Sequence, residues 1–560
     1  MPSARERGPI WLRLLLALVV AGVSLERLHA LLAAVPTDFD DAYMYLRYAQ
    51  HALAGQWLVW NLGEAPVYGV TSLLHFLLVT LLRGTLPGLG QAAALQTASG
   101  AAAFTLLAAL VALCARFSAN ARLRGNFLFW GALLVPLLFY REAFFFHARL
   151  GMDSLLAGLA NTAVAFASLR LAERPSSGRA VTTAAIGLLA IEARPDCAII
   201  AGLCPLLALW LLGRAPRLRA LLIWAGCFAG LVLLDLVLKR TLLGTPLPLA
   251  FYAKQPWYYR GFVGEFTWNP FWFLEVALAA VWPAIFATVL FARRENLRLL
   301  LVLLVPAACT CAALFSVNQI MGHLGRFYFP SLPLIVAAGA LAADRWLHGL
   351  SEDLAASQAA LRLARSLLLR LGLALLVVLG GARTLQDAGR IYQARAQTQS
   401  LASLDGYQVS ASAPLPELDS WRASQEIARL AADAPAGTGF AMSEHGLVAA
   451  SAPRAEIIDV LGLHDPIFAR DGFSAAELWR RRPDVIWMPH PDHTQMVHDI
   501  LASDELWRHY VFYPDAFTYG LALRQDSQRS ARLAALFAER WQASYPDLRP
   551  ADYLATQSRK

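Results

Sequence analysis

The chain has 560 residues, of which 57% are hydrophobic and only 16% are charged, whereas soluble domains carry about 25% charged residues. This composition excludes an ordinary soluble enzyme and predicts a polytopic α-helical membrane protein. The net charge of +8 is better explained by arginines in cytoplasmic loops than by nucleic-acid binding, because the arginines cluster between apolar runs.

Apolar segments that can cross a bilayer recur as far as residue 381. A crossing takes about 20 apolar residues, and on that basis we predict about 11 transmembrane helices. They cover residues 10–35, 91–115, 126–143, 153–171, 180–194, 197–213, 217–240, 271–292, 298–316, 330–346 and 362–381. No clear cleavage site follows the first segment, so an uncleaved helix is favoured over a signal peptide.

The arginine-rich loops set the predicted orientation. Placing all of them in the cytoplasm gives strict alternation, with the N-terminus inside and everything after residue 381 outside. Residues 70–83 are apolar but short for a crossing, and counting them would reverse every later loop. We therefore predict an embedded or re-entrant helix there, within a first outer loop that covers residues 36–90.

The chain is predicted to have two parts, a transmembrane domain over 1–390 and a periplasmic α/β domain over 400–560. Patterning in the second part predicts short buried strands at 456–461 and 483–488, and helices at 421–432, 474–482 and 529–544. All six cysteines precede residue 312, so the second part has neither a disulfide nor a cysteine metal site. His490-Pro-Asp-His493 resembles a metal cluster in composition, although a polar surface loop is favoured.

An acidic stretch, Asp38-Phe-Asp40-Asp41, follows the first predicted span. One interpretation is local, with Asp38 or Asp40 as the N-cap of a helix over 42–54 that lies on the membrane surface. The other is catalytic, because one carboxylate raises the pKa of its neighbour and so makes a plausible general base. The local sequence leaves the two interpretations about even.

The other predicted outer loops carry further candidates. One interpretation of Asp153 is a favourable negative charge at the start of a predicted helix. The other is that Asp153 and Asp40 supply oxygen ligands to Mg²⁺ or Mn²⁺. Arg149, Lys254 and Arg326 are either snorkelling cations or a clamp on a phosphate group. Arg194 lies between two apolar runs close to Asp196, where a charge is costly and is either paired or functional. Loop aromatics such as Tyr68 and Tyr252 suit a membrane-interface belt or the stacking of sugars.

The order of these motifs resembles a known family. Asp40-Asp-Ala-Tyr-x-Tyr-Leu-Arg-Tyr-Ala, Gly151-Met-Asp153, Arg194-Pro-Asp196, Phe251-Tyr-Ala-Lys254, Gly325-Arg-Phe-Tyr-Phe-Pro330 and Asp459-Val-Leu-Gly-Leu-x-Asp465-Pro are similar to segments of the C-type glycosyltransferases. The similarity is greatest to the arabinofuranosyltransferase-like branch of the enzymes that use polyprenyl-phosphate sugars. Two departures affect the substrate site, since Asp153 stands in place of Glu and Tyr68-Gly-Val in place of Glu-Gly-Tyr.

This resemblance implies a multi-pass enzyme of the cytoplasmic membrane. It would transfer a sugar from a polyprenyl-phosphate donor to a hydroxyl of a cell-envelope glycan, lipid or protein, with inversion. The resemblance implies that Asp40 is the base, that Asp41 is the second acid of the pair, and that a metal at Asp153 remains optional. Lys254 and Arg326, with Arg149, would hold the donor phosphate, and Asp153, Tyr68, Tyr252 and Arg194 would contact substrates. The alternatives are a transporter or flippase for a lipid-linked sugar, or a non-catalytic scaffold of the same fold.

Overall fold

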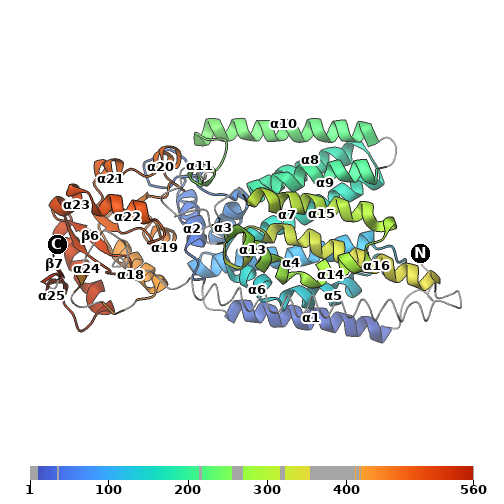
Figure 1. Cartoon of the computed structure of the whole chain (residues 1–560), viewed down its shortest axis with the longest axis horizontal. Coiled ribbons are helices and arrows are strands. Elements are labelled where there is room, and N and C mark those ends of the chain that lie inside the picture. Colours follow the sequence, from blue (N-terminus) through green and yellow to red (C-terminus); the bar gives the residue numbers. More distant parts are fainter. Residues whose placement is uncertain are drawn as a thin grey trace.

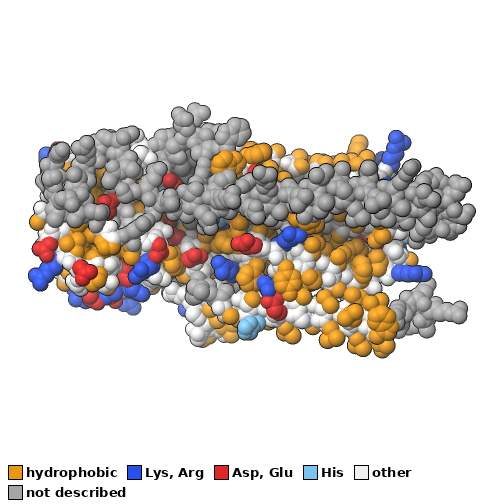
Figure 2. Space-filling view, turned by 60° about the horizontal axis from the view of Figure 1, so that its bottom comes forward, with side chains coloured by type: hydrophobic (Ala, Val, Ile, Leu, Met, Phe, Trp, Pro, Cys, Tyr) orange, Lys and Arg blue, Asp and Glu red, His pale blue; other side chains and the backbone are white. Residues whose placement is uncertain are grey.

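The computed structural model describes residues 10–33, 37–213, 217–254, 269–315, 319, 322–353, 410–411, 415–416, 418–555 and 557–558. A bundle of long helices occupies one end of the molecule and a small α/β region occupies the other (Figure 1). Hydrophobic side chains dominate the visible face of the bundle, whereas charged side chains gather over the α/β region (Figure 2).

A helix forms over every predicted span that lies within the described residues. The helices of this part are α1 (Ile10–Ala33), α2 (Asp40–Leu53), α3 (Leu73–Thr85), α4 (Gln91–Phe117), α5 (Phe127–Phe139), α6 (Glu142–Arg149), α7 (Ser154–Glu173), α8 (Ser177–Ala193), α9 (Ala198–Leu211), α10 (Arg217–Leu243), α11 (Leu249–Ala253), α13 (Asn269–Ala280), α14 (Trp282–Phe291), α15 (Arg294–Leu314) and α16 (Leu332–Asp353). The predicted span 362–381 lies outside the described residues.

Among the described residues, six helices are long and apolar enough to cross a membrane, or up to eight if each bent pair counts as one span. The bent pairs are α5 with α6, at 82°, and α13 with α14, at 74°. Helix α8 has 17 residues and α9 has 14, so both are shorter than an ordinary span. The chain is therefore a multi-pass membrane protein, and the predicted number of about 11 spans stays a prediction.

Helix α3 covers the segment predicted to be embedded rather than spanning. It has 13 residues, and the Ser72 side chain caps its first turn by accepting a hydrogen bond from the His75 amide. It packs against α2 and α4. The helix itself is confirmed, and its embedded or re-entrant placement stays a prediction.

The C-terminal region is built on a five-stranded sheet in the order β3-β2-β4-β6-β5. Strands β2 (Gly439–Met442), β3 (Glu456–Asp459) and β4 (Val485–Trp487) are parallel, and β6 (Leu521–Arg524) runs antiparallel to β4 and to β5 (Tyr510–Tyr513). A separate pair joins β1 (Ser410–Ala411) to β7 (Gln557–Ser558). The helices around the sheet are α18 (Ser420–Asp433), α19 (Gly446–Ser451), α20 (Pro466–Asp471), α21 (Ala475–Arg481), α22 (Thr494–Leu501), α23 (Asp504–His509), α24 (Ser530–Ser544) and α25 (Pro550–Ala555).

The hydrophobic core divides at a place that the sequence does not reveal. One cluster joins buried residues of the transmembrane helices, among them α4, α7, α15 and α16. A second cluster is continuous from α2 and α3 into the C-terminal sheet and its helices. The first outer loop thus shares its core with the C-terminal region, although some 400 residues separate them in the sequence.

Arg47, in the middle of α2, fixes this junction. Its guanidinium is fully buried and donates hydrogen bonds to the Trp60 carbonyl at 2.6 Å and to the Asn61 side chain at 2.9 Å. It also donates to three backbone carbonyls of the C-terminal region, those of Ala449, Ala452 and Ala455. Carbonyls at the end of a helix have no partner within the helix, so Arg47 caps the end of α19.

Candidate active site

Asp40 and Asp41 are the first two residues of α2, but neither of them caps it. The N-cap residue is Phe39, and no side chain bonds to the first turn. The predicted capping role of Asp38 or Asp40 is therefore wrong. Ten of its residues are buried and it packs against α19 and α3, and its position at the membrane surface stays a prediction.

Asp40 turns its carboxylate toward the C-terminal region. Its two oxygens accept hydrogen bonds from the backbone amides of Gly446, at 2.7 Å, and Leu447, at 2.8 Å. A Cβ on Gly446 would lie 2.0 Å from the Asp40 carbonyl, so only glycine permits this approach. Burial raises the pKa of Asp40, against the opposing effects of His445 and of the two amides.

Asp41 turns the other way and pairs with Arg326. The guanidinium donates to the Asp41 carboxylate at 2.8 Å and lies 4.9 Å from the centre of the Phe39 ring. Burial alone would raise the pKa of Asp41, but the charges of Arg326 and Lys254 hold it below its usual range. The two neighbouring acids thus have different electrostatic environments: one is buried beside amides, and the other is paired with cations.

Three of the four predicted cations lie close together. The guanidinium of Arg326 and that of Arg194 each lie 5.4 Å from the Phe327 ring centre, and the ammonium of Lys254 lies 5.9 Å from it. Arg194 also pairs with Asp196 at 3.0 Å. The Nε of Arg326 is buried without a hydrogen-bond partner. An anion in this position would satisfy a donor that the chain leaves open.

Within the described residues, no side-chain contact links Arg149 or Tyr68 to this group. The Arg149 side chain makes no hydrogen bond or ion pair within the part of the chain that the structure describes. The Tyr68 ring lies 5.0 Å from the ammonium of Lys239, which pairs with Asp235 at 2.7 Å. Tyr252 is half-buried, with its ring 6.2 Å from that of Phe251.

Asp153 is buried beside hydroxyl groups. One of its oxygens accepts hydrogen bonds from Tyr45 at 3.2 Å and from Thr71 at 3.3 Å. Within the described ranges, neither Asp153 nor Asp40 belongs to a group of three metal-ligating side chains. Asp40 has amide partners and Asp153 has hydroxyl partners, and a metal at Asp153 stays a prediction.

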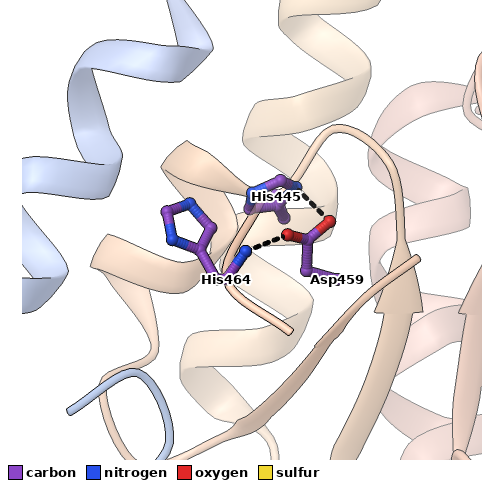
Figure 3. A group of neighbouring side chains, drawn as sticks. All are labelled: His445, Asp459 and His464. Atoms are coloured by element: carbon purple, nitrogen blue, oxygen red, sulfur yellow. Dashed lines mark hydrogen bonds and ion pairs between the residues drawn. The ribbon is translucent and has the colours of Figure 1, made fainter. Parts of the chain in front are cut away.

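One metal-like group does occur among the described residues, formed by His445, Asp459 and His464 (Figure 3). Apart from Nε2 of His445, its ligating atoms have other partners. Nδ1 of His445 donates to the Ser443 carbonyl at 2.7 Å, and Asp459 accepts the His464 amide at 2.7 Å. The His464 ring stacks on Trp60 at 3.9 Å, and its Nδ1 bonds to the Tyr48 hydroxyl at 3.0 Å. This set fits a structural network and does not fit a metal centre.

Sequence reasoning missed Glu444 and His445. Burial raises the pKa of Glu444 well above its usual range, and the charges of Asp40, Asp41 and Asp492 add to this shift. His445 is buried with its Nε2 unpartnered. The signal was the polar run Ser443-Glu-His, which directly follows the apolar strand β2.

A known structure shares this fold. No protein-family model matches the chain, and no curated protein matches it in sequence. The crystal structure of ArnT from Cupriavidus metallidurans in the apo state superposes with a TM-score of 0.52 and 13% identity, over 90% of this chain and 97% of that one. The apo oligosaccharyltransferase of Archaeoglobus fulgidus gives a TM-score of 0.44 and 13% identity, over 80% of this chain and 64% of that one. The likeness to ArnT confirms the predicted fold, that of the C-type glycosyltransferases with a C-terminal α/β region.

Proposed function

We propose that this protein is a membrane glycosyltransferase that moves a sugar from a polyprenyl-phosphate donor to an acceptor hydroxyl at the outer face of the cytoplasmic membrane. The observation that carries the proposal is the ion pair between Asp41 and Arg326, formed beside Lys254 and next to Asp40. A cation site for a phosphate and a separate buried carboxylate are the two groups that such a transfer needs.

Arg326, Lys254 and Arg194 would hold the donor phosphate. A phosphate could replace the Asp41 carboxylate on Arg326 and also engage the open Nε, because guanidinium binds phosphate through paired hydrogen bonds. During transfer, the bond between the anomeric carbon and the phosphate oxygen breaks, and its electron pair stays on the phosphate. The cations stabilise the charge that grows there.

Asp40 would be the general base. The acceptor oxygen bonds to the anomeric carbon, and its proton passes to Asp40. Each carboxylate oxygen has two lone pairs, and the amides of Gly446 and Leu447 use one on each. A single displacement from the face opposite the phosphate inverts the sugar. The arabinofuranosyltransferase-like resemblance makes pentofuranose donors the first to test.

Release of polyprenyl phosphate tests this function and separates it from transport. Purified protein in detergent is incubated with polyprenyl-phosphate pentoses and hexoses as donors and with methyl glycosides as acceptors, with and without EDTA. A transferase releases polyprenyl phosphate with no membrane gradient, whereas a flippase or scaffold releases none from any donor. We expect EDTA to leave the release unchanged, because the acids have amide, hydroxyl or cation partners.

A further inference from the structure

The strand order of the C-terminal sheet reverses at β2. The chain passes from β2 to its neighbour β3 on one side and then to β4 on the other side, and all three strands are parallel. In sheets of this kind, ligands bind outside the carboxyl ends of the strands at the point where the order reverses. That point lies here between the ends of β2 and β4.

Polar residues follow both strands at this edge. Ser443, Glu444 and His445 come directly after β2, and His490, Asp492 and His493 come shortly after β4. The two segments are joined by a hydrogen bond of 2.9 Å from the His490 amide to the Ser443 hydroxyl. The edge is therefore one surface built from two connections.

The same edge meets the candidate base. Gly446, one residue after His445, donates its amide hydrogen to Asp40. The charges of Asp40, Asp41 and Asp492 all act on Glu444, and those of Glu444, Asp40 and Asp492 all act on the buried Tyr519. A molecule bound at this edge would thus lie next to Asp40.

Several groups at the edge lack a partner. Nε2 of His445 and Nδ1 of His493 have none, and these two side chains are only 2% and 3% exposed. Figure 3 shows Nδ1 of His445 turned to Asp459 and Nε2 on the other side of the ring. The Glu444 side chain is half-buried and makes no hydrogen bond or ion pair to any described part of the chain. Buried polar groups left open in this way are costly, and a polar ligand would satisfy them.

We propose that this edge, formed by Glu444, His445, His490, Asp492 and His493, is the acceptor site, and that it binds a neutral or amino-substituted saccharide. The inference rests on the proposed function, which it deepens. Carboxylate and imidazole groups hydrogen-bond to sugar hydroxyls. The nearby acids disfavour an anionic acceptor by like-charge repulsion.

Saccharide binding is the direct test, because it does not depend on turnover. Full-length protein in nanodiscs is titrated by saturation-transfer NMR with three probes: methyl β-galactopyranoside, methyl 2-amino-2-deoxy-β-glucopyranoside and methyl galactopyranosiduronate. We expect the first two to bind and the uronate to bind at least about fivefold more weakly. The E444Q/D492N variant should weaken binding of the first two about tenfold. The matched control is E456Q, at the exposed amino end of β3.

The outcomes separate the site from the function. If the double variant binds saccharide as wild type does, or if the uronate binds as well as the neutral probe, the acceptor site is wrong. In turnover, the variant should raise the acceptor KM about tenfold and leave the donor KM unchanged, and a parallel rise in donor KM would also overturn the inference. If no donor is consumed but binding still depends on Glu444 and Asp492, the glycosyltransferase proposal fails and the saccharide site stands.

Discussion

At the scale of single residues, the two neighbouring acids are distinguished by their partners. Asp40 accepts two backbone amides, and Asp41 accepts a guanidinium. Adjacent positions on a helix point about 100° apart, so Asp40 and Asp41 can reach opposite surroundings. In the proposed function, Asp40 is therefore available as the base. Asp41 pairs with Arg326 until the donor phosphate replaces it there.

Replacing Arg326 by glutamine should weaken donor binding and reverse the effect of Asp41 on stability. In wild type the pKa of Asp41 is lowered, so its contribution to stability is present above the usual Asp range and is lost as the pH falls through the lowered value. Without Arg326 the pKa of Asp41 should rise, since burial is the largest opposing effect, and its charge should then destabilise the protein at neutral pH.

Thermal unfolding of R326Q at pH 7 and pH 4.5 checks the predicted change in the effect of Asp41 on stability. The loss of Tm in R326Q should be largest at pH 7 and smaller at pH 4.5, and the donor KM should rise at least about tenfold. The exposed Arg298 supplies the control variant R298Q. A Tm loss that is equal at both pH values would contradict the account of Asp41.

The pH profile of turnover tests Asp40. Because burial raises the pKa of Asp40, the acid limb of kcat/KM should lie above the usual carboxyl range, with activity falling as Asp40 takes up a proton. The charge of His445 acts against this rise. H445Q should therefore move the acid limb to higher pH, and an unchanged or lowered limb would show that His445 does not act on the base.

At the scale of elements, α19 is held at both ends by α2. Asp40 binds the amides at its start and Arg47 binds carbonyls at its end, seven residues further along α2. Seven residues are about two helical turns, so both side chains lie on one face. A carboxylate at the start and a guanidinium at the end also match the helix dipole.

Replacing Gly446 by alanine should separate α19 from Asp40. The added Cβ would lie 2.0 Å from the Asp40 carbonyl, so the two elements must move apart. We expect a loss of stability of about 1–3 kcal/mol and a fall in kcat. G226A is the control, because a Cβ on Gly226 meets nothing within 4 Å. Denaturant unfolding that shows G446A as stable as G226A would contradict the close contact.

Hydropathy predicts most of the helical elements, because a helix that lies in lipid needs a run of apolar residues within its own segment. The ten described segments predicted as spans are all helical. The predicted C-terminal helices form as α18, α21 and α24, and the predicted strands form as β3 and β4. The strands β2 and β6 were missed because neither contains a β-branched residue, whereas β3 and β4, which are no longer, contain Ile or Val. Strand β5 was also missed.

At the scale of the whole molecule, the first outer loop belongs to the C-terminal core. Loop order and charge could predict that Asp41, Lys254 and Arg326 share one face, and the structure brings them together. Sequence could not predict that Asp40 binds Gly446, 406 residues away, because no local pattern encodes such a contact. For the same reason Glu444 and His445 were not recognised.

Replacing Arg47 by methionine should loosen the C-terminal region from the bundle. The change removes the guanidinium donor from four buried carbonyls and leaves the Asn61 oxygen with only the Ile457 amide, which we expect to cost about 3 kcal/mol or more. Limited proteolysis should then release the C-terminal region faster than in wild type. Equal rates of cleavage would show that the shared hydrophobic core alone holds the two parts together.

The central claim is that Asp40 is the base of a sugar transfer. The most direct measurement compares polyprenyl-phosphate release, in the presence of acceptor, by wild type, D40N and D38N. Asp38 is exposed and lies two residues away, so D38N makes the same chemical change outside the site. We predict that D40N folds but loses about 10²- to 10⁴-fold in kcat, whereas D38N keeps wild-type activity. Release by D40N at the rate of D38N would contradict the account.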